Sequence, residues 1–238
     1  MGAAVLQQQF ESLLGGQFGW RERPAPEIVS TGISALDSAV GGLPRGCLTE
    51  IFGPASSGRS SLLASILAMA TQREEVCALI DAEDSFDPLS AAAAGVRLER
   101  VLWIRCGHSA EHALKSADLL IQGGGFGLVA MDLGDTPIAT ARRISLTSWF
   151  RLRRAVENTP TVLVVLARQS NAKTCASLML ECTRERTRWT GAFPVFRGIR
   201  ARVLRRKPGR AVTACYDATL GRYPTCPSQV PRFQPSHQ

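Results

Sequence analysis

Short apolar runs alternate with amphipathic stretches through the middle of the chain. The runs cover residues 48–52, 76–80, 101–104, 128–131 and 161–167. Between them, apolar residues recur at helical spacing over about residues 60–72, 88–95, 109–122 and 137–158. Short strands that are apolar throughout and separated by helices are typical of a parallel sheet buried on both faces. The pattern therefore predicts an α/β fold.

The two ends of the chain have different patterns. Residues 5–14 have apolar side chains at helical spacing, which predicts a helix, and residues 17–27 read as a connector. After Ala167 we expect strands over 177–182, 199–206 and 211–218, the last two joined by a turn at Pro208-Gly209. We expect three parts: an N-terminal helix and connector (1–27), a core (28–222) and a loose tail (223–238) rich in Pro, Ser and Gln.

Length and composition limit the class of protein. A chain of 238 residues that is 45% hydrophobic fits one α/β domain with small appendages. Its longest strongly apolar run, 61–70, is shorter than the roughly 20 residues that a bilayer requires. The seven cysteines never have C-x-x-C spacing, which favours free thiols over disulfides or a zinc site. We expect a cytoplasmic protein with no membrane partner.

The net charge of +8 is concentrated in one late segment. Residues 184–210 contain ten Arg or Lys and one acid. Basic and apolar residues alternate over 197–210, as in a half-buried strand, and the basic face of such a strand can follow phosphates. DNA, with single strands favoured, is therefore the expected partner of Arg197, Arg200, Arg202, Arg205, Arg206 and Lys207. The alternative is an edge strand that charge protects from self-association, or a docking surface for an acidic protein.

One segment has the pattern of a phosphate-binding loop. It follows a predicted strand, opens a predicted helix and reads Gly53-Pro54-Ala55-Ser56-Ser57-Gly58-Arg59-Ser60-Ser61. In such a loop, glycines let backbone N–H groups turn toward phosphate oxygens, and the helix N-terminus adds a favourable dipole. Arg59 stands where the pattern has Lys, and Ser60 where a hydroxyl would hold Mg²⁺. The alternative is an ordinary glycine turn that caps a helix.

Four motifs occur in order around this loop. They are Ser30-Thr31-Gly32-Ile33-Ser34-Ala35-Leu36-Asp37, Gly41-Gly42-Leu43-Pro44-Arg45-Gly46, Glu50-Ile51-Phe52-Gly53-Pro54 and Leu79-Ile80-Asp81-Ala82-Glu83. Together they resemble the core of RecA-type ATPases over roughly residues 28–218. The resemblance implies a RecA-like P-loop core, with a mostly parallel sheet sandwiched by helices, antiparallel C-terminal strands, and an N-terminal helix available for self-association. It also implies ATP and Mg²⁺ as cofactors.

The resemblance implies roles for individual residues. Residues 53–61 would bind the nucleotide phosphates, and Asp87 would recognise the adenine amino group. Glu83 would activate the attacking water, a role suited to a carboxylate beside the γ-phosphate. Asp132 would hold Mg²⁺ together with Ser60. Asp132 could instead simply end a strand, and Asp87 could cap the following helix.

Several positions depart from the family's pattern. The guanidinium of Arg59 is bulkier than an ammonium and cannot nest identically between the β- and γ-phosphates. Ser90 replaces the tyrosine that stacks on adenine. The stretches after Asp132 and Ala167 are short for the family's two DNA-binding loops. In these respects the chain is similar to the short RecA-like accessory proteins of bacterial damage-induced mutagenesis, the ImuA and SulA-like proteins, which work beside an error-prone polymerase.

Two functions therefore compete. In the first, the protein is an ATP-binding accessory in DNA repair or damage-induced mutagenesis, with weak or no hydrolysis. In the second, it is a non-catalytic module with a RecA fold that binds a polymerase or RecA itself. An active recombinase is a distant third, because the DNA-binding loops are short. Mg²⁺-dependent binding of ATP would separate the first two.

Overall fold

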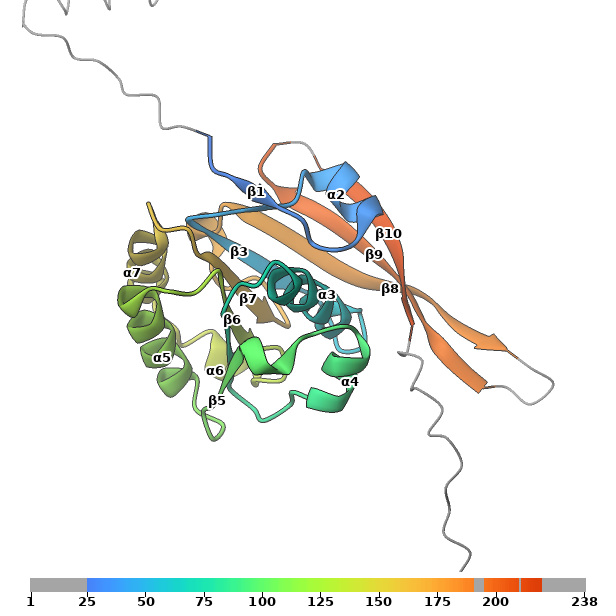
Figure 1. Ribbon diagram of the computed structural model, residues 1–238, viewed down its shortest axis with the longest axis horizontal. Helices are drawn as coiled ribbons and strands as arrows, with labels where there is room; N and C mark the ends of the chain where they lie inside the picture. The colour runs from blue at the N-terminus through green and yellow to red at the C-terminus, as the bar shows by residue number, and fades with distance from the viewer. Residues whose placement is uncertain (1–24, 191–194, 210, 220–238) are drawn as a thin grey trace, which may run out of the picture.

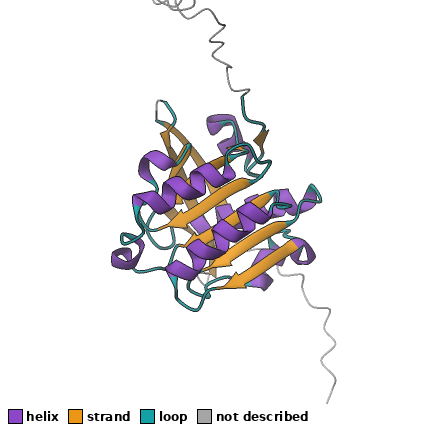
Figure 2. Cartoon of the chain, turned by 90° about the vertical axis from the view of Figure 1, so that its left-hand side faces the viewer, coloured by secondary structure: helices purple, strands orange, loops and turns teal. Residues whose placement is uncertain are grey.

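A parallel sheet with helices on both faces forms the centre of the molecule (Figures 1 and 2). The computed structural model describes residues 25–190, 195–209 and 211–219. The strands of the main sheet are Cys47–Phe52 (β3), Cys77–Asp81 (β4), Val101–Arg105 (β5), Leu128–Leu133 (β6), Val162–Ala167 (β7), Leu178–Thr190 (β8), Val195–Lys207 (β9) and Val212–Thr219 (β10). Their order is β10-β9-β8-β3-β7-β6-β4-β5, with β3 to β8 parallel and β9 and β10 antiparallel. The predicted fold class is confirmed.

Smaller elements complete the fold. A short antiparallel pair is formed by Ile28–Val29 (β1) and Leu43–Pro44 (β2). The helices are Ser34–Val40 (α2), Arg59–Gln72 (α3), Pro88–Ala93 (α4), Ala110–Gly123 (α5), Ile138–Ala141 (α6) and Leu146–Val156 (α7), with 3₁₀ turns at Leu98–Arg100 and Lys173–Cys175. None of the helices formed by the described residues has the length and apolar character needed to cross a membrane. The predicted N-terminal helix and the predicted tail lie outside the described residues.

The sheet separates two hydrophobic cores. Successive residues of β4 enter opposite cores: Cys77 and Leu79 pack on the side of α2 and α3, and Ala78 and Ile80 on the side of α5 and α7. All four side chains are fully buried. A strand that is buried on both faces favours apolar side chains on both, which explains the nearly continuous apolar runs in the sequence.

The prediction of a single helix over residues 137–158 is wrong. The structure has two helices there, α6 and α7, separated by residues 142–145. The Ser145 hydroxyl accepts a hydrogen bond from the Ser148 N–H at 3.1 Å and caps α7. A serine that binds the backbone in this way favours a helix start over a helix interior.

Two of the three C-terminal strands, β8 and β9, are longer than predicted. The expected strand 177–182 continues to Thr190 as β8, and the β8–β9 pair projects beyond the helical layers (Figure 1). Residues 183–190 carry charged and polar side chains, so apolar spacing does not mark them as a strand. The turn at Pro208-Gly209 does join β9 to β10, as predicted.

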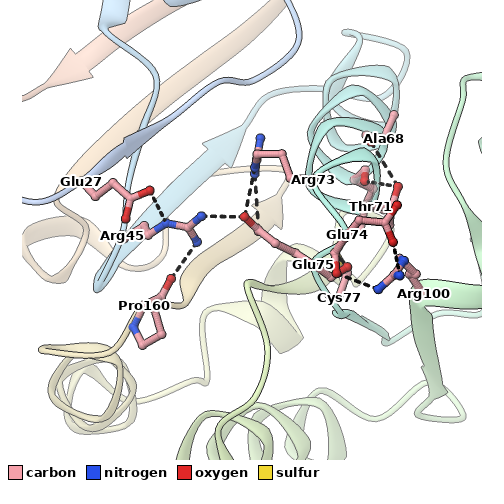
Figure 3. A network of polar contacts seen from close by, with 11 residues as sticks. Glu27, Arg45, Ala68, Thr71, Arg73, Glu74, Glu75, Cys77, Arg100 and Pro160 are labelled. Carbon is pink, nitrogen blue, oxygen red and sulfur yellow. Dashed lines mark hydrogen bonds and ion pairs between the residues drawn. The ribbon is translucent and has the colours of Figure 1, made fainter.

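An ion-pair network ties together the amino ends of the strands (Figure 3). Arg45 precedes β3, and its guanidinium donates to the Glu75 carboxylate at 2.6 Å and to the Pro160 carbonyl at 2.8 Å. It also pairs with Glu27 at 3.2 Å. Glu75 precedes β4 and Pro160 precedes β7. The network therefore lies at the edge of the sheet opposite to the loops that follow the strands.

A buried carboxylate on β3 positions the segment that follows β7. Glu50 is fully buried. Its Oε1 accepts hydrogen bonds from the Asn171 and Ala172 N–H groups at 2.6 and 2.8 Å, and its Oε2 accepts one from the Ser170 hydroxyl at 2.7 Å. A buried carboxylate requires such donors, and the donors would be unsatisfied without it. Glu50 therefore fixes the backbone at residues 171 and 172, shortly after β7 ends.

We expect Glu50→Ala to destabilise the protein by about 3 to 5 kcal/mol, because the Asn171 and Ala172 N–H groups and the Ser170 hydroxyl lose their acceptor. Glu50→Gln should cost about 1 kcal/mol, because an amide oxygen at the Oε1 position still accepts both N–H bonds. Urea unfolding of the two variants measures the difference. Equal stability losses would show that the carboxylate does not hold residues 170–172 in place.

Candidate nucleotide-binding site

The predicted phosphate loop connects β3 to α3 at the carboxyl end of the sheet. Its two glycines are required by close packing as well as by conformation. A Cβ at Gly53 would lie 2.1 Å from the Cys182 carbonyl oxygen, and Gly58 has a φ of +97° with the Tyr216 hydroxyl 2.8 Å from its ideal Cβ position. Ala201 lies equally close to that position. The loop therefore packs against β8, β9 and β10.

The loop has an exposed part and a buried part. The exposed residues are Pro54, Ala55, Ser56, Ser60 and Ser61, and the buried residues are Gly53, Ser57, Gly58 and Arg59. Ser60 and Ser61 line a cavity of about 750 Å³, which is large enough for a nucleotide. The same cavity is lined by Ile33, Phe86, Asp87, Ser90, Asp132 and Tyr216. The structure thus brings the loop, Asp87 and Asp132 to one cavity.

Arg59 points into the protein beneath the loop. Its side chain is only 6% exposed, and its Nη1 donates to the Gly134 carbonyl oxygen at 3.2 Å. Burial lowers the pKa of its guanidinium, although the nearby Asp132 and Asp135 carboxylates act in the opposite direction. The resemblance predicts a cation that contacts phosphate at this position. In the structure, Arg59 instead donates a hydrogen bond to the backbone carbonyl of Gly134, two residues after Asp132.

Asp132 lies on β6 directly opposite Asp81 of the neighbouring strand β4. Its Oδ1 accepts a hydrogen bond from the Gly134 N–H at 2.7 Å. Burial raises the pKa of the Asp132 carboxyl to about 6, against the lowering effect of that hydrogen bond. Hydroxyl and carboxylate oxygens are the ligands that Mg²⁺ prefers, and Ser60 and Asp132 line the same cavity. These two residues fit a Mg²⁺ ion, and their role as its ligands stays a prediction.

Glu83 follows β4 and contacts a histidine that the sequence did not single out. Its Oε2 lies 2.9 Å from His108 Nδ1. Glu83 is absent from the described residues that line the cavity, although Asp87 four residues later is among them. Its predicted role as the residue that activates water is untested. A carboxylate oxygen that is engaged by imidazole is less available to a water molecule.

Asp81 holds the segment that carries both Glu83 and Asp87. The Asp81 carboxylate is fully buried and accepts hydrogen bonds from the Ser85 and Phe86 N–H groups at 3.0 and 2.9 Å. It also accepts one from the Trp103 indole on β5 at 3.3 Å. Trp103 in turn packs edge-on against Phe86, with ring centroids 5.4 Å apart.

Asp87 caps α4, which is the structural alternative left open by the sequence. Its carboxylate accepts hydrogen bonds from the Leu89 and Ser90 N–H groups at 3.1 and 3.2 Å, and from the Ser90 hydroxyl. The Ser90 hydroxyl contributes most to holding the pKa of the Asp87 carboxyl below its usual value. Because Asp87 also lines the cavity, the cap does not exclude contact with a base.

Two residues of the site had no role assigned to them from the sequence. Tyr216 of β10 lines the cavity, and its buried hydroxyl donates to the Gly58 carbonyl oxygen at 2.8 Å. Arg168, the residue after β7, donates from Nε to the Gly134 carbonyl oxygen at 3.1 Å. No motif marks Tyr216, because it is contributed by an antiparallel strand far along the chain. Arg168 follows a predicted strand directly, which is the signal that could have indicated it.

The predicted DNA-contacting residues are largely paired within the hairpin. Side chains of β8, β9 and β10 form a connected series of ion pairs, Arg188–Asp217–Arg200–Glu185–Arg202, and Arg206 pairs with Glu181. The Lys207 ammonium donates to the Thr174 and Ala176 carbonyls. Arg205 is partly buried, and the Arg197 side chain lies outside the described residues. The basic surface is therefore weaker than the sequence alone suggests.

A glycine-containing loop between a parallel strand and a helix, with a carboxylate at the end of a neighbouring strand, defines the class of P-loop nucleotide-binding proteins. A family model described as the RecA N-terminal domain matches residues 8–142, which is more than half of the chain, so the chain belongs to the RecA family. The protein RecA of Ectopseudomonas oleovorans is 32% identical over 158 residues. That match covers 59% of this chain and 44% of the relative, so the chain spans less than half of that protein.

The raised pKa of Asp132 predicts how stability depends on pH. A carboxyl whose pKa is about 6 in the folded protein and 3.8 in the unfolded chain favours folding when protonated, and this contribution is lost as pH rises through 6. In Mg²⁺-free buffer, Asp132→Asn should therefore be more stable than the wild type by about 2 to 3 kcal/mol at pH 7.5. The two proteins should differ little below pH 4. Urea unfolding at several pH values measures this. A constant difference between the two proteins across pH would contradict a raised pKa.

Proposed function

We propose that this chain binds ATP with Mg²⁺ at the carboxyl end of its parallel sheet and hydrolyses it slowly or not at all. The observation that carries the proposal is the cavity shared by Ser60, Ser61, Asp87 and Asp132, next to the phosphate loop and the N-terminus of α3. Open α/β sheets bind ligands at this edge, and a helix N-terminus favours phosphate. Membership of the RecA family supports the same ligand.

Two contacts support slow hydrolysis. Arg59 donates to the Gly134 carbonyl, so its charge is not placed above the loop where a transferred phosphoryl group would develop charge. Glu83 is engaged by His108. A nucleotide would then serve to hold one conformation of the protein rather than to drive turnover.

We also propose an accessory role in DNA repair or damage-induced mutagenesis, beside a polymerase or RecA. This role is supported by the family and by the short connections after β6 and β7. Between β6 and α6 there are four residues, 134–137, and between β7 and β8 there are ten, 168–177. Loops of this length leave little chain to surround a DNA strand. The β8–β9 hairpin is the remaining candidate for DNA contact, together with self-association through the predicted N-terminal helix.

A second candidate function is a non-catalytic interaction module. The observation that favours it is that the protein's own side chains already contact the phosphate loop and its helix start. Tyr216 binds the Gly58 carbonyl from one side, and Arg59 is anchored to Gly134 on the other. A loop braced in this way keeps its shape without phosphate. Direct measurement of ATP binding decides between the two functions.

We expect Arg59→Lys to bind Mg²⁺–ATP about tenfold more tightly than the wild type, equal to about 1.4 kcal/mol. The compact ammonium restores a point charge at the phosphates. Titration calorimetry measures the affinities, and Arg154→Lys, an exposed exchange on α7, is the matched control. Unchanged affinity in a folded Arg59→Lys variant would indicate that the loop has only a structural role and does not bind phosphate. Wild-type turnover near about 1 s⁻¹ would contradict slow hydrolysis.

The ion pairs of the hairpin predict a gain of DNA binding when its acids are neutralised. Glu185→Gln with Asp217→Asn should release Arg188, Arg200 and Arg202 and strengthen binding of single-stranded DNA. Each new phosphate contact should steepen the slope of log affinity against log salt by about 0.7. Fluorescence anisotropy at several salt concentrations measures the slope.

The matched control for this variant is Glu111→Gln, which removes an exposed acid on α5, paired with Lys115. It should leave both the affinity and the salt slope unchanged. Weak, salt-insensitive binding by the double variant would favour the alternative in which the charged strands prevent self-association or dock an acidic protein.

A further inference from the structure

Two acids that follow β4 are each held by a side chain at the end of the neighbouring strand β5. Glu83 Oε2 lies 2.9 Å from His108 Nδ1. The Asp84 carboxylate accepts hydrogen bonds from Arg105 Nη2 and Nε at 2.9 and 3.1 Å. Because β4 and β5 are parallel and paired, the segments that follow them leave the same edge of the sheet. The two contacts therefore join these two segments at the candidate site.

Glu83 is largely shielded from water, whereas the imidazole that binds it faces the solvent. The exposed fraction is 14% for the Glu83 side chain and 69% for that of His108. An ionised carboxylate only accepts hydrogen bonds, so His108 Nδ1 carries the proton of this contact. The same imidazole lies near Asp84. The hydrogen bond from Arg105 and, with a smaller effect, the charge of His108 hold the pKa of the Asp84 carboxyl below its usual value.

The backbone of His108 has a conformation that histidine rarely adopts. Gly107 and His108 have φ angles of +59° and +61°. They form the centre of a turn in which the Ser109 N–H donates to the Cys106 carbonyl at 3.3 Å. Glycine and asparagine are favoured at positive φ, whereas a bulky side chain there costs conformational free energy. An unfavourable residue in a turn beside a candidate site indicates a role for its side chain.

We propose that His108 is a positioning residue that holds Glu83 away from the attacking water and thereby suppresses hydrolysis of ATP. The inference rests on the proposed nucleotide binding and on the predicted role of Glu83. In hydrolysis, the water oxygen bonds to the terminal phosphorus, the bond from that phosphorus to the oxygen of ADP breaks, and a base takes the proton of the water. The contact with His108 holds Glu83 Oε2 outside the described lining of the cavity. Loss of the imidazole frees this oxygen.

The test measures turnover as phosphate release at saturating Mg²⁺–ATP. His108→Gly removes the imidazole, suits the left-handed backbone and should raise turnover about tenfold or more, because a correctly placed base contributes at least that much. His108→Asn also suits positive φ and places an amide N–H as many bonds from the backbone as Nδ1. Its turnover should stay within about twofold of the wild type. His108→Gly combined with Glu83→Gln should lose the gain.

Matched controls separate this contact from a general loosening of the segment. Arg105→Ala removes the other contact, the one with Asp84, and should leave turnover within about twofold of the wild type. His112→Ala removes an exposed imidazole on α5 and should have no effect. Nitrogen-15 NMR gives a readout besides activity, because Glu83→Gln should shift the Nδ1 signal of His108 and leave that of His112 in place.

The outcomes separate this inference from the proposed function. If the wild type and His108→Gly both bind ATP in titration calorimetry but hydrolyse it equally slowly, the inference is wrong and the proposed binding of ATP stands. An equal gain in His108→Gly and Arg105→Ala would also contradict it. If the wild type binds no ATP, the proposed function fails and the inference fails with it. Should His108→Gly fail to fold, His108→Ala removes the same imidazole and gives the same comparison.

Discussion

The close approach of the phosphate loop to the C-terminal strands is the constraint on which the candidate site depends. At Gly53 the backbone of the loop passes so near the Cys182 carbonyl that no side chain fits, and at Gly58 the Tyr216 hydroxyl takes the place that a Cβ would need. Strand β10, through Tyr216, Asp217 and Ala218, forms one wall of the cavity beside the loop. A displacement of β8 or β10 would therefore also displace the loop backbone that is expected to bind phosphate.

The sequence was sufficient to predict features that depend on local pattern. Nearly continuous apolar runs predicted the parallel strands, because strands buried on both faces favour apolar side chains on both. Spacing predicted the phosphate loop and its position between β3 and α3. The break between α6 and α7 was not predicted, because Ser145 is compatible with a helix until its hydroxyl binds the Ser148 N–H. The extension of β8 was missed because an exposed, charged strand lacks apolar alternation.

Contacts between segments that lie far apart along the chain could not be predicted from the sequence. Nothing in the spacing shows that His108 meets Glu83, or that Arg59 and Arg168 share one carbonyl. The charge of the hairpin is a similar case. A count of basic residues between 184 and 210 suggests a strong polyanion site, but Glu181, Glu185 and Asp217 lie across the strands from the arginines and pair with them. The surface field depends on that pairing more than on composition.

The Asp81 carboxylate connects the candidate site to the edge of the sheet. It binds the backbone of residues 85 and 86 and, through the Trp103 indole, the outermost strand β5. These hydrogen bonds connect the segment that contains Glu83 and Asp87 to β5, the edge strand of the sheet, where Leu102 and Trp103 are exposed. A molecule that binds to β5 at this edge would change the position of residues 83–87 without contacting the phosphate loop.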